Sequence, residues 1–166
     1  ADRPLPRSTT GVGHTRWATH GAPNDVNAHP HVGYAGRVAL VHNGIIENFV
    51  ELRTGLENAG HELASETDTE VAAHLLELEL DAGADLTTAM QRVCCRLEGA
   101  FTLVAIDATD PSCVVAARRN SPLVVGLGEG ENFLGSDVAA FIEHTREAME
   151  LGQDQVVTIT REGVSV

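Results

Sequence analysis

The residues best equipped for chemistry are concentrated between positions 13 and 48. This stretch holds five of the eight histidines, the only tryptophan and the only tyrosine of the 166-residue chain. The five histidines are His14, His20, His29, His31 and His42. An extended segment would place His29 and His31 on one side, and imidazole is a common zinc ligand. No helical His-x-x-x-His pair and no cysteine ligand pattern accompanies them. We therefore expect the imidazoles to fix loops by hydrogen bonding rather than to hold a metal.

The chain contains no lysine and only three cysteines. All 11 basic residues are arginine, so the chain offers no lysine for Schiff-base chemistry, phosphate-loop binding or general-base catalysis. Cys94 and Cys95 fall in a segment with helical apolar periodicity, and Cys113 begins an apolar, β-branched run. We interpret all three thiols as small core residues rather than reactive groups. The residues alone thus identify no nucleophile.

The elements that must position these residues begin with two expected strands, at residues 11–17 and 37–41, separated by a loop. The second strand is expected to stop at His42-Asn43-Gly44, because Asn-Gly is a strong turn signal. Three helices are then expected, at residues 45–58, from the Thr67-x-x-Glu70 capping box to residue 80, and from residue 86 to residue 99.

The second half of the chain is dominated by short apolar runs typical of antiparallel strands. They cover residues 101–106, 113–117, 123–127 and 156–160. Ser136-Asp137 is a cap for a short helix toward Ile142, whereas the state of residues 145–151 stays open. Gly126-x-Gly128-x-Gly130 imitates half of a dinucleotide fingerprint, but no helix with a suitable apolar face follows, so we predict a turn. The pattern predicts one α+β domain with helices packed on antiparallel sheet.

The net charge of the chain limits the binding partners that we expect. The chain has 24 acidic and 11 basic residues, a formal net charge of −13 and a pI near 4.8. Nucleic acid and anionic membranes are therefore not expected as partners. An odd number of cysteines, with no secretory leader and no apolar run of membrane length, is typical of a reducing, cytoplasmic setting.

Four ordered motifs carry a resemblance to a known family. They are His14-Thr15-Arg16-Trp17-Ala18-Thr19-His20-Gly21, Asn27-Ala28-His29-Pro30-His31, His42-Asn43-Gly44-Ile45-Ile46-Glu47-Asn48 and Ser65-Glu66-Thr67-Asp68-Thr69-Glu70, with further likeness at residues 118–126 and 132–137. Together they resemble the glutaminase domain of the glutamine:fructose-6-phosphate aminotransferases. The resemblance implies a class II glutamine amidotransferase of the N-terminal-nucleophile hydrolase type. Such a domain is an αββα sandwich that releases ammonia from glutamine without a metal or other cofactor.

The resemblance implies how the amino-acid end of glutamine is recognised. Arg16 would hold the α-carboxylate, assisted by Thr19 and His20, and Asp68 would bind the α-ammonium. These roles suit the chemistry, because a guanidinium presents parallel N–H donors to a carboxylate and an acidic side chain complements an ammonium. Trp17 would lie on the loop that closes over the substrate.

The resemblance also implies an oxyanion hole. The side-chain amide of Asn43 and the backbone N–H of Gly44 would be aimed where the tetrahedral intermediate develops negative charge. Taken singly, Asn-Gly is more often a hairpin turn, a tryptophan more often core, and Arg16 and Asp68 more often surface ion-pair residues. Because these residues occur together and in the order of the family's motifs, the glutamine site is favoured over the individual interpretations.

The chain departs from the family at its start. The family's nucleophile is a cysteine at the mature N-terminus, whereas this sequence begins with Ala1 and has only ten residues before Gly11. We expect residues 1–10 to be an irregular opening segment and residues 11–166 to be a partial glutaminase domain. Such a chain would lack the first strands, the nucleophile and the sugar-phosphate isomerase domains, and would be inactive alone. The full enzyme would bind L-glutamine and form a homodimer.

Three alternatives remain. A related class II amidotransferase, such as amidophosphoribosyltransferase, would share the hydrolase chemistry. A non-catalytic amino-acid-binding module would bind glutamine without turnover. A metal-binding protein would bind zinc or nickel stoichiometrically.

Overall fold

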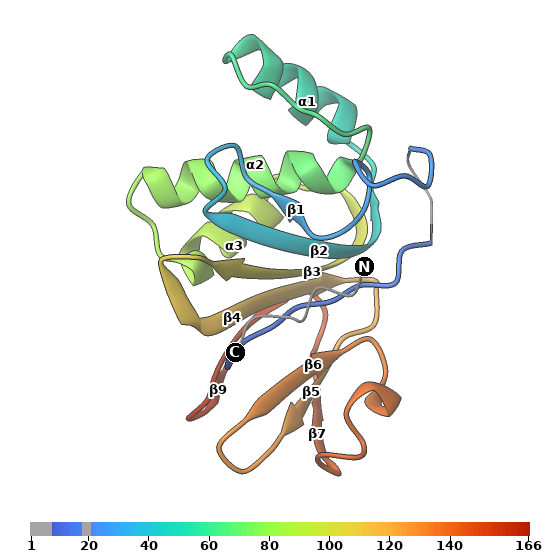
Figure 1. Ribbon diagram of the computed structural model, residues 1–166, viewed down its shortest axis with the longest axis vertical. Helices are drawn as coiled ribbons and strands as arrows, with labels where there is room; N and C mark the ends of the chain where they lie inside the picture. Colours follow the sequence, from blue (N-terminus) through green and yellow to red (C-terminus); the bar gives the residue numbers. More distant parts are fainter. Residues whose placement is uncertain (1–7, 18–20) are drawn as a thin grey trace.

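The computed structural model describes residues 8–17 and 21–166 (Figure 1). In chain order its elements are β1 (His31–Val32), β2 (Val38–Ile46), α1 (Phe49–Asn58), α2 (Asp68–Asp81), α3 (Leu86–Cys94), β3 (Gly99–Asp107), β4 (Asp110–Arg119), β5 (Val124–Leu127), β6 (Asn132–Gly135), the 3-10 helix η1 (Val138–Ala140), β7 (Glu147–Glu150), β8 (Gln155–Thr160) and β9 (Val164–Ser165).

The strands form two antiparallel sheets. The larger sheet has the order β1-β2-β3-β4-β8-β9, and the smaller has the order β6-β5-β7. Helices α2 and α3 cover one face of the larger sheet, and α1 lies beyond α2 (Figure 1). The smaller sheet packs against the other face where β4 and β8 run. The described residues therefore form three layers, in the order helix, sheet, sheet.

Strand alternation divides the core between these layers. Val115 and Ala117 of β4 belong to the cluster that packs on the helices. Ala116, between them, packs with Val125 of β5 and Leu151 in the cluster beneath the smaller sheet. Successive side chains of a strand point to opposite faces, so one apolar run serves both clusters. This explains why β4 reads as a continuous apolar run rather than an alternating one.

The start of α2 is the most heavily bonded helix end. The Thr67 hydroxyl accepts the Glu70 N–H at 3.3 Å, as the capping-box spacing predicts. The Glu70 carboxylate turns back to accept the N–H groups of Ala64 and Ser65, at 2.8 and 2.7 Å, rather than that of Thr67. These bonds fix the loop before the helix, and with it the position of Asp68.

The strand predicted at residues 11–17 is wrong. These residues pair with no strand among the described parts of the chain, and a Cβ added at Gly11 or Gly13 would have no neighbouring atom within 4 Å. Instead the segment is tied at a few points, such as the Thr10 hydroxyl donating to Pro111 O at 2.7 Å. The first strand of the structure is β1, which the sequence pattern did not indicate.

The turn predicted at Asn43-Gly44 is also wrong. Both residues lie inside β2, which pairs without interruption with β3 from Val38↔Asp107 to Ile46↔Gly99. Gly44 keeps the positive φ of a turn glycine, +133°, but uses it within the strand. Because Ile45 and Ile46 stay in the strand, α1 begins at Phe49 and not at residue 45.

Most of the remaining expectations are confirmed. The predicted strands correspond to β3, β4, β5 and β8, and the helix after the capping box is α2. Helix α3 ends at Cys94, and Gly99 opens β3 instead of closing the helix. The segment after Ser136-Asp137 forms a single 3-10 turn, and the open segment 145–151 contains β7.

An ion pair between half-buried Arg37 and buried Asp107 lies at the Val38↔Asp107 end of the β2–β3 ladder. The Arg37 guanidinium donates from Nε and Nη2 to the two carboxylate oxygens of Asp107, at 2.9 and 2.6 Å. Thr109 adds its N–H and its hydroxyl to the same carboxylate. The hydrogen bonds from Arg37 lower the pKa of Asp107 from 3.8 to about 2.

We expect Asp107→Asn to lower the free energy of unfolding by about 2 kcal/mol at pH 7. Because the pKa is lower in the folded state, the stabilisation is complete above about pH 5 and is lost as the pH falls through about 2. Urea unfolding of the wild type and the variant at pH 7, 4 and 2.5 should therefore give converging curves. Asp25→Asn, which removes the same charge from an exposed position, is the control; an equal effect of both variants would contradict the assignment.

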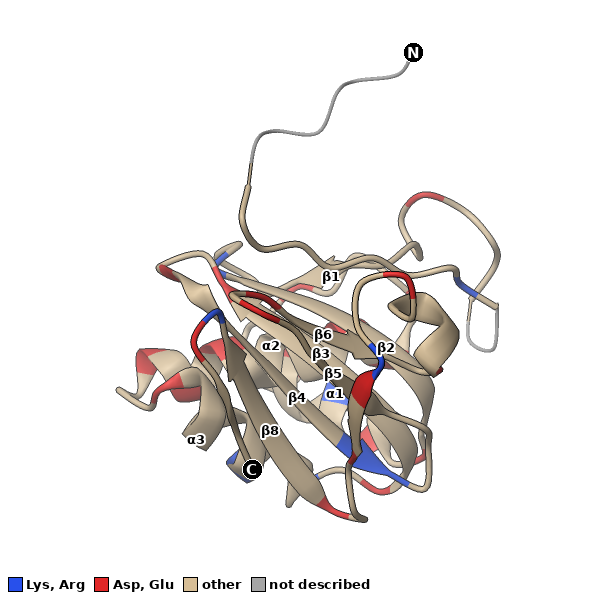
Figure 2. Cartoon of the chain, turned by 90° about the horizontal axis from the view of Figure 1, so that it is seen from below, with Lys and Arg blue, Asp and Glu red and all other residues tan. Residues whose placement is uncertain are grey.

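Acidic residues outnumber basic residues in the chain, 24 to 11. In the cartoon of Figure 2, positions occupied by Asp and Glu, coloured red, are spread over helices, strands and loops. No helix in the described part of the chain is long and apolar enough to cross a membrane.

Candidate functional site

A cavity of about 380 Å³ opens where three segments meet: residues 14–17, the middle of β2 and the start of α2. Its lining comprises His14, Thr15, Arg16, Trp17, His29, His42, Asn43, Gly44, Ile45, Thr67, Asp68 and Thr69. Five of the residues implicated by sequence, Arg16, Trp17, Asn43, Gly44 and Asp68, are therefore gathered around one space. Thr19 and His20 lie outside the described residues.

Arg16 forms one wall of the cavity. Its Nη1 and Nη2 donate to the carbonyl oxygens of Ala22 and Gly21, each at 3.2 Å. Those carbonyls belong to a loop that Asn27 holds in place, because the buried Asn27 amide donates to Ala22 O at 3.0 Å and to Glu66 at 3.1 Å. The loop thus orients the guanidinium at the cavity.

Asp68 also lines the cavity, at the first position of α2. Its side chain is only 5% exposed, and Oδ2 accepts the backbone N–H of Ile46 at 2.9 Å. The positive end of the helix dipole favours a carboxylate at this position. Oδ1 lies 3.4 Å from the Thr69 hydroxyl and 3.6 Å from Nδ1 of His42. The cavity is thus lined by one carboxylate and one guanidinium, a pair that suits a zwitterionic ligand.

Gly44 presents its backbone N–H away from β3. Ala108 N donates to Arg37 O, and Glu47 N donates to Glu98 O, so the odd-numbered residues of this ladder direct their polar groups toward β3. Gly44 is even-numbered, and it lies beyond the end of β1, which pairs only with Ala39 and Leu40. Its N–H is thus on the side of the strand that β1 leaves uncovered.

Only glycine fits at position 44. A Cβ there would lie 2.1 Å from the carbonyl oxygen of Ala100 and 2.8 Å from Cα of Phe101. Both obstacles are backbone atoms of β3, which cannot move aside without breaking the sheet. Asn43, next to it, has an exposed side chain at the cavity. The pair therefore offers one amide side chain and one main-chain N–H to the same space.

The histidines around the cavity are joined through two threonines. His29 Nε2 and His42 Nδ1 lie 3.1 and 3.0 Å from the Thr69 hydroxyl, and His31 Nε2 lies 3.0 Å from that of Thr67. Hydrogen bonding that fixes the surrounding loops is the use that the sequence predicted for them. Within the described ranges, no three His, Cys, Asp or Glu side chains are grouped so that they could hold a metal.

Burial keeps His29 uncharged. Desolvation, aided by the neighbouring His14, lowers the pKa of His29 from 6.5 to about 3. His14 stacks on it with 4.4 Å between ring centroids, and the pKa of His14 is lowered for the same main reason. Burial therefore favours the uncharged form of both stacked rings.

No cysteine or serine lines the cavity among the described residues. Cys94 is buried in α3, where desolvation raises the pKa of its thiol to about 12. Desolvation also raises the pKa of Cys113. The prediction that all three cysteines are core residues holds for Cys94 alone, because Cys95 is exposed just after α3 and Cys113 is half-buried.

Comparison with known proteins identifies the fold and the family. The sequence matches the glutamine amidotransferase domain over residues 5–165, nearly its whole length. The chain belongs to the glutamine amidotransferase domain family. The resemblance seen in the sequence motifs is thereby confirmed.

Two curated relatives of this amidotransferase domain carry the same name. Glutamine--fructose-6-phosphate aminotransferase [isomerizing] of Streptomyces coelicolor is 69% identical over 166 residues, which are 100% of this chain and 27% of the relative. The protein of that name from Corynebacterium diphtheriae is 62% identical over 165 residues, 98% of this chain and 26% of the relative. The amidotransferase chain thus spans about a quarter of the length of the curated relatives it matches.

Among solved structures, the amidotransferase domain is similar to glutamine phosphoribosylpyrophosphate amidotransferase from B. subtilis complexed with ADP and GMP. The TM-score is 0.75 at 24% identity, over 92% of this chain and 33% of that one. At this identity the likeness shows the fold alone, and it confirms the α+β class.

Thr67 and Thr69 are among the cavity residues that sequence reasoning did not assign to the site, as are Thr15 and Ile45. The sequence pattern identifies Thr67 only as a helix cap and gives Thr69 no use, yet both line the cavity and bond the histidines. The signal that could have found them is their position on either side of Asp68 in the Ser65–Glu70 motif.

Proposed function

We propose that the chain is the glutamine-recognising and amide-activating part of an enzyme that transfers the amide nitrogen of L-glutamine to fructose 6-phosphate. The observation that carries this proposal is the single cavity bounded by Arg16, Asp68, Asn43 and Gly44. A cation and an anion suit the two charged groups of an amino acid, and two N–H donors suit a reacting amide carbonyl.

Arg16 would bind the α-carboxylate of glutamine, and Asp68 would bind its α-ammonium. The guanidinium is held by the carbonyls of Gly21 and Ala22, and the carboxylate by the N–H of Ile46. Hydrogen bonds that hold a charged side chain before binding reduce the entropic cost of recognition. Trp17, 89% exposed at the cavity, would cover the bound ligand. Thr19 and His20 would assist Arg16.

Activation of the amide would use Asn43 and Gly44 as an oxyanion hole. The Gly44 N–H lies on the side of β2 turned from β3, and the Asn43 amide is exposed beside it. Fixed donors stabilise charge that develops in the transition state and need little reorganisation during the reaction. The nucleophile would be an N-terminal cysteine, which is not among the described residues.

The identity of the acceptor rests on the relatives. Both are named as glutamine--fructose-6-phosphate aminotransferases, at 69% and 62% identity, whereas the phosphoribosyl amidotransferase is 24% identical. The further inferences are an αββα sandwich of the N-terminal-nucleophile type, sugar-phosphate isomerase domains beside it, a homodimer and a cytoplasmic setting. A full-length protein that used phosphoribosyl pyrophosphate rather than fructose 6-phosphate as acceptor would favour the alternative amidotransferase.

Recognition of the ammonium can be tested at Asp68. We expect Asp68→Asn to weaken L-glutamine binding by about ten- to a hundredfold, the scale of a hydrogen bond to a charged group. Asn keeps an oxygen that can accept the Ile46 N–H, so the fold should survive. Calorimetric titration of the wild type and the variant measures the loss.

A ligand without the ammonium supplies the control. The wild type should bind 4-carbamoylbutanoate, which lacks only the α-amino group, much more weakly than L-glutamine. Asp68→Asn should bind the two ligands with similar affinity. Retained discrimination in the variant would remove Asp68 from the ammonium site.

A further inference from the structure

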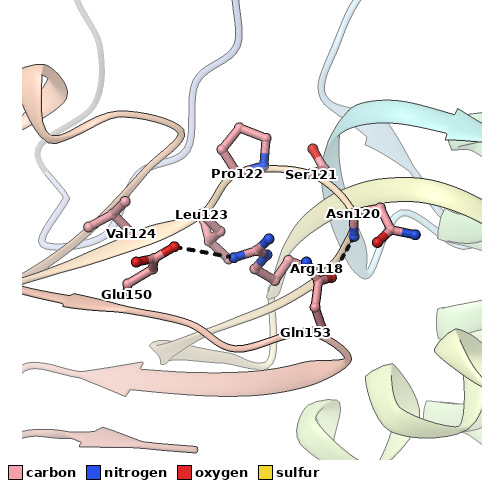
Figure 3. Close-up of a pocket in the computed structure, with 8 residues that line it drawn as sticks. All are labelled: Arg118, Asn120, Ser121, Pro122, Leu123, Val124, Glu150 and Gln153. Carbon is pink, nitrogen blue, oxygen red and sulfur yellow. Dashed lines mark hydrogen bonds and ion pairs between the residues drawn. The ribbon is translucent and has the colours of Figure 1, made fainter.

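A second cavity, of about 450 Å³, lies beside the turn between β4 and β5. Figure 3 shows its lining, with Arg118 directed toward Glu150 and Gln153 bonded to Asn120. In this view the Ser121 hydroxyl points away from Arg118 and Glu150. That hydroxyl belongs to a turn that no other part of the proposed chemistry uses.

The turn is fixed from several directions. Asn120 has a positive φ of 51°, and its N–H donates to the Gln153 side chain at 2.8 Å. Pro122 O accepts the Thr102 hydroxyl at 3.1 Å, and Arg118 Nη1 donates to Leu151 O at 2.7 Å. Ser121 lies between these anchors and is only 8% exposed. Its position is therefore set by the surrounding sheets.

Ser121 contacts the strand that carries the proposed oxyanion hole. Its hydroxyl donates to the backbone carbonyl of Asn43 at 3.3 Å. The carbonyl of Asn43 and the N–H of Gly44 are two ends of one planar peptide group. A bond that holds the carbonyl therefore also sets the direction of the N–H. It also polarises the peptide, which strengthens that N–H as a donor.

The Asn43 carbonyl also faces β3, because Asn43 is an odd-numbered residue of the β2–β3 ladder and pairs with Thr102. The space beside Cα of Gly44 is closed by Ala100 O and Cα of Phe101. The peptide therefore lies against the backbone of β3, and the Ser121 hydroxyl adds a side-chain hydrogen bond to its carbonyl. The positive φ of Gly44 departs from ordinary strand geometry, so this additional bond helps to set the tilt of a peptide whose general direction the ladder gives.

We propose that Ser121 is a positioning residue for the oxyanion hole, acting through the Asn43 carbonyl to orient the Gly44 N–H. This inference rests on the proposed glutaminase function. It assigns a role in the transition state to a residue that touches neither substrate nor nucleophile. Ser121 should thus affect the rate of amide hydrolysis much more than the binding of glutamine.

The test is steady-state glutamine hydrolysis by the full-length protein that carries this sequence. We expect Ser121→Ala to lower kcat about tenfold while KM for L-glutamine and the midpoint of thermal unfolding stay near the wild-type values. Ser121→Thr, which keeps a hydroxyl on the same carbon, should restore most of kcat. Ser112→Ala removes a hydroxyl that donates to Asp110 at the exposed start of β4, and it should leave kcat unchanged.

The outcomes separate this inference from the proposed function. An unchanged kcat in Ser121→Ala, with the wild type active, would overturn the positioning role alone. A parallel loss of kcat, KM and thermal stability, without rescue by threonine, would also overturn it, because a merely structural defect would explain the loss. A wild-type protein that hydrolyses no glutamine would instead contradict the proposed function.

Discussion

The 166-residue chain by itself is expected to release no measurable ammonia from L-glutamine. Hydrolysis through an acyl-enzyme needs an activated nucleophile. No cysteine or serine is among the described residues that line the cavity, and burial raises the pKa of Cys94 to about 12. In another acyl-transfer enzyme, loss of the nucleophile lowers kcat on the order of 10⁶-fold. Binding contacts and oxyanion donors alone would leave a rate below the detection limit of an ammonia assay.

The measurement is glutamate release by the purified chain, with and without an upstream segment that begins with cysteine, supplied by co-expression. Turnover should appear only with that segment and should vanish when its first cysteine is replaced by alanine. Steady turnover by the chain alone would contradict the prediction. If Cys94→Ala, Cys95→Ala or Cys113→Ala then abolished it, the nucleophile would be that cysteine.

Asn43→Ala in the full-length protein is expected to reduce the rate of glutamine hydrolysis about 10²- to 10³-fold, the usual cost of one oxyanion donor. Ground-state binding should change little, because Arg16 and Asp68 are the residues proposed to recognise the amino-acid end. The side chain of Asn43 is exposed, so its truncation leaves no cavity in the core. Stability should therefore be close to that of the wild type.

Two variants sharpen this prediction. Asn43→Asp keeps the shape but replaces the N–H donors with a carboxylate, and it should be at least as slow as the alanine variant. Asn58→Ala, at the exposed end of α1, should retain full activity. Normal turnover by Asn43→Ala would remove this side chain from the oxyanion hole.

Local signals located most of the secondary structure. The Thr67-x-x-Glu70 spacing marked the start of α2, and the apolar runs after residue 100 marked β3, β4, β5 and β8. These features depend on neighbours within a few residues, such as the cap bond from Glu70 N to Thr67, so sequence reveals them. The family also followed from the sequence, because long ordered motifs preserve identity without any knowledge of packing.

Asn43-Gly44 shows where local signals fail. A dipeptide that usually turns the chain instead continues β2, because nine successive pairs with β3 outweigh one local preference. Residues 11–17 are the opposite case. Their composition suits a strand, but they pair with no strand among the described residues. Pairing is a property of two segments, and the pattern of one segment does not contain it.

The sequence by itself determined the class of the protein, the order of its main elements and the residue types that would recognise an amino acid. Only the tertiary structure decided that Arg16, Asn43 and Asp68 share one cavity. It also decided that Ser121, 78 residues from Asn43, donates a hydrogen bond to the carbonyl of the Asn43–Gly44 peptide group. The physical reason is that these contacts join segments distant in the chain. Their geometry is set by sheet register and by the packing of α2 on β2, which no single segment encodes.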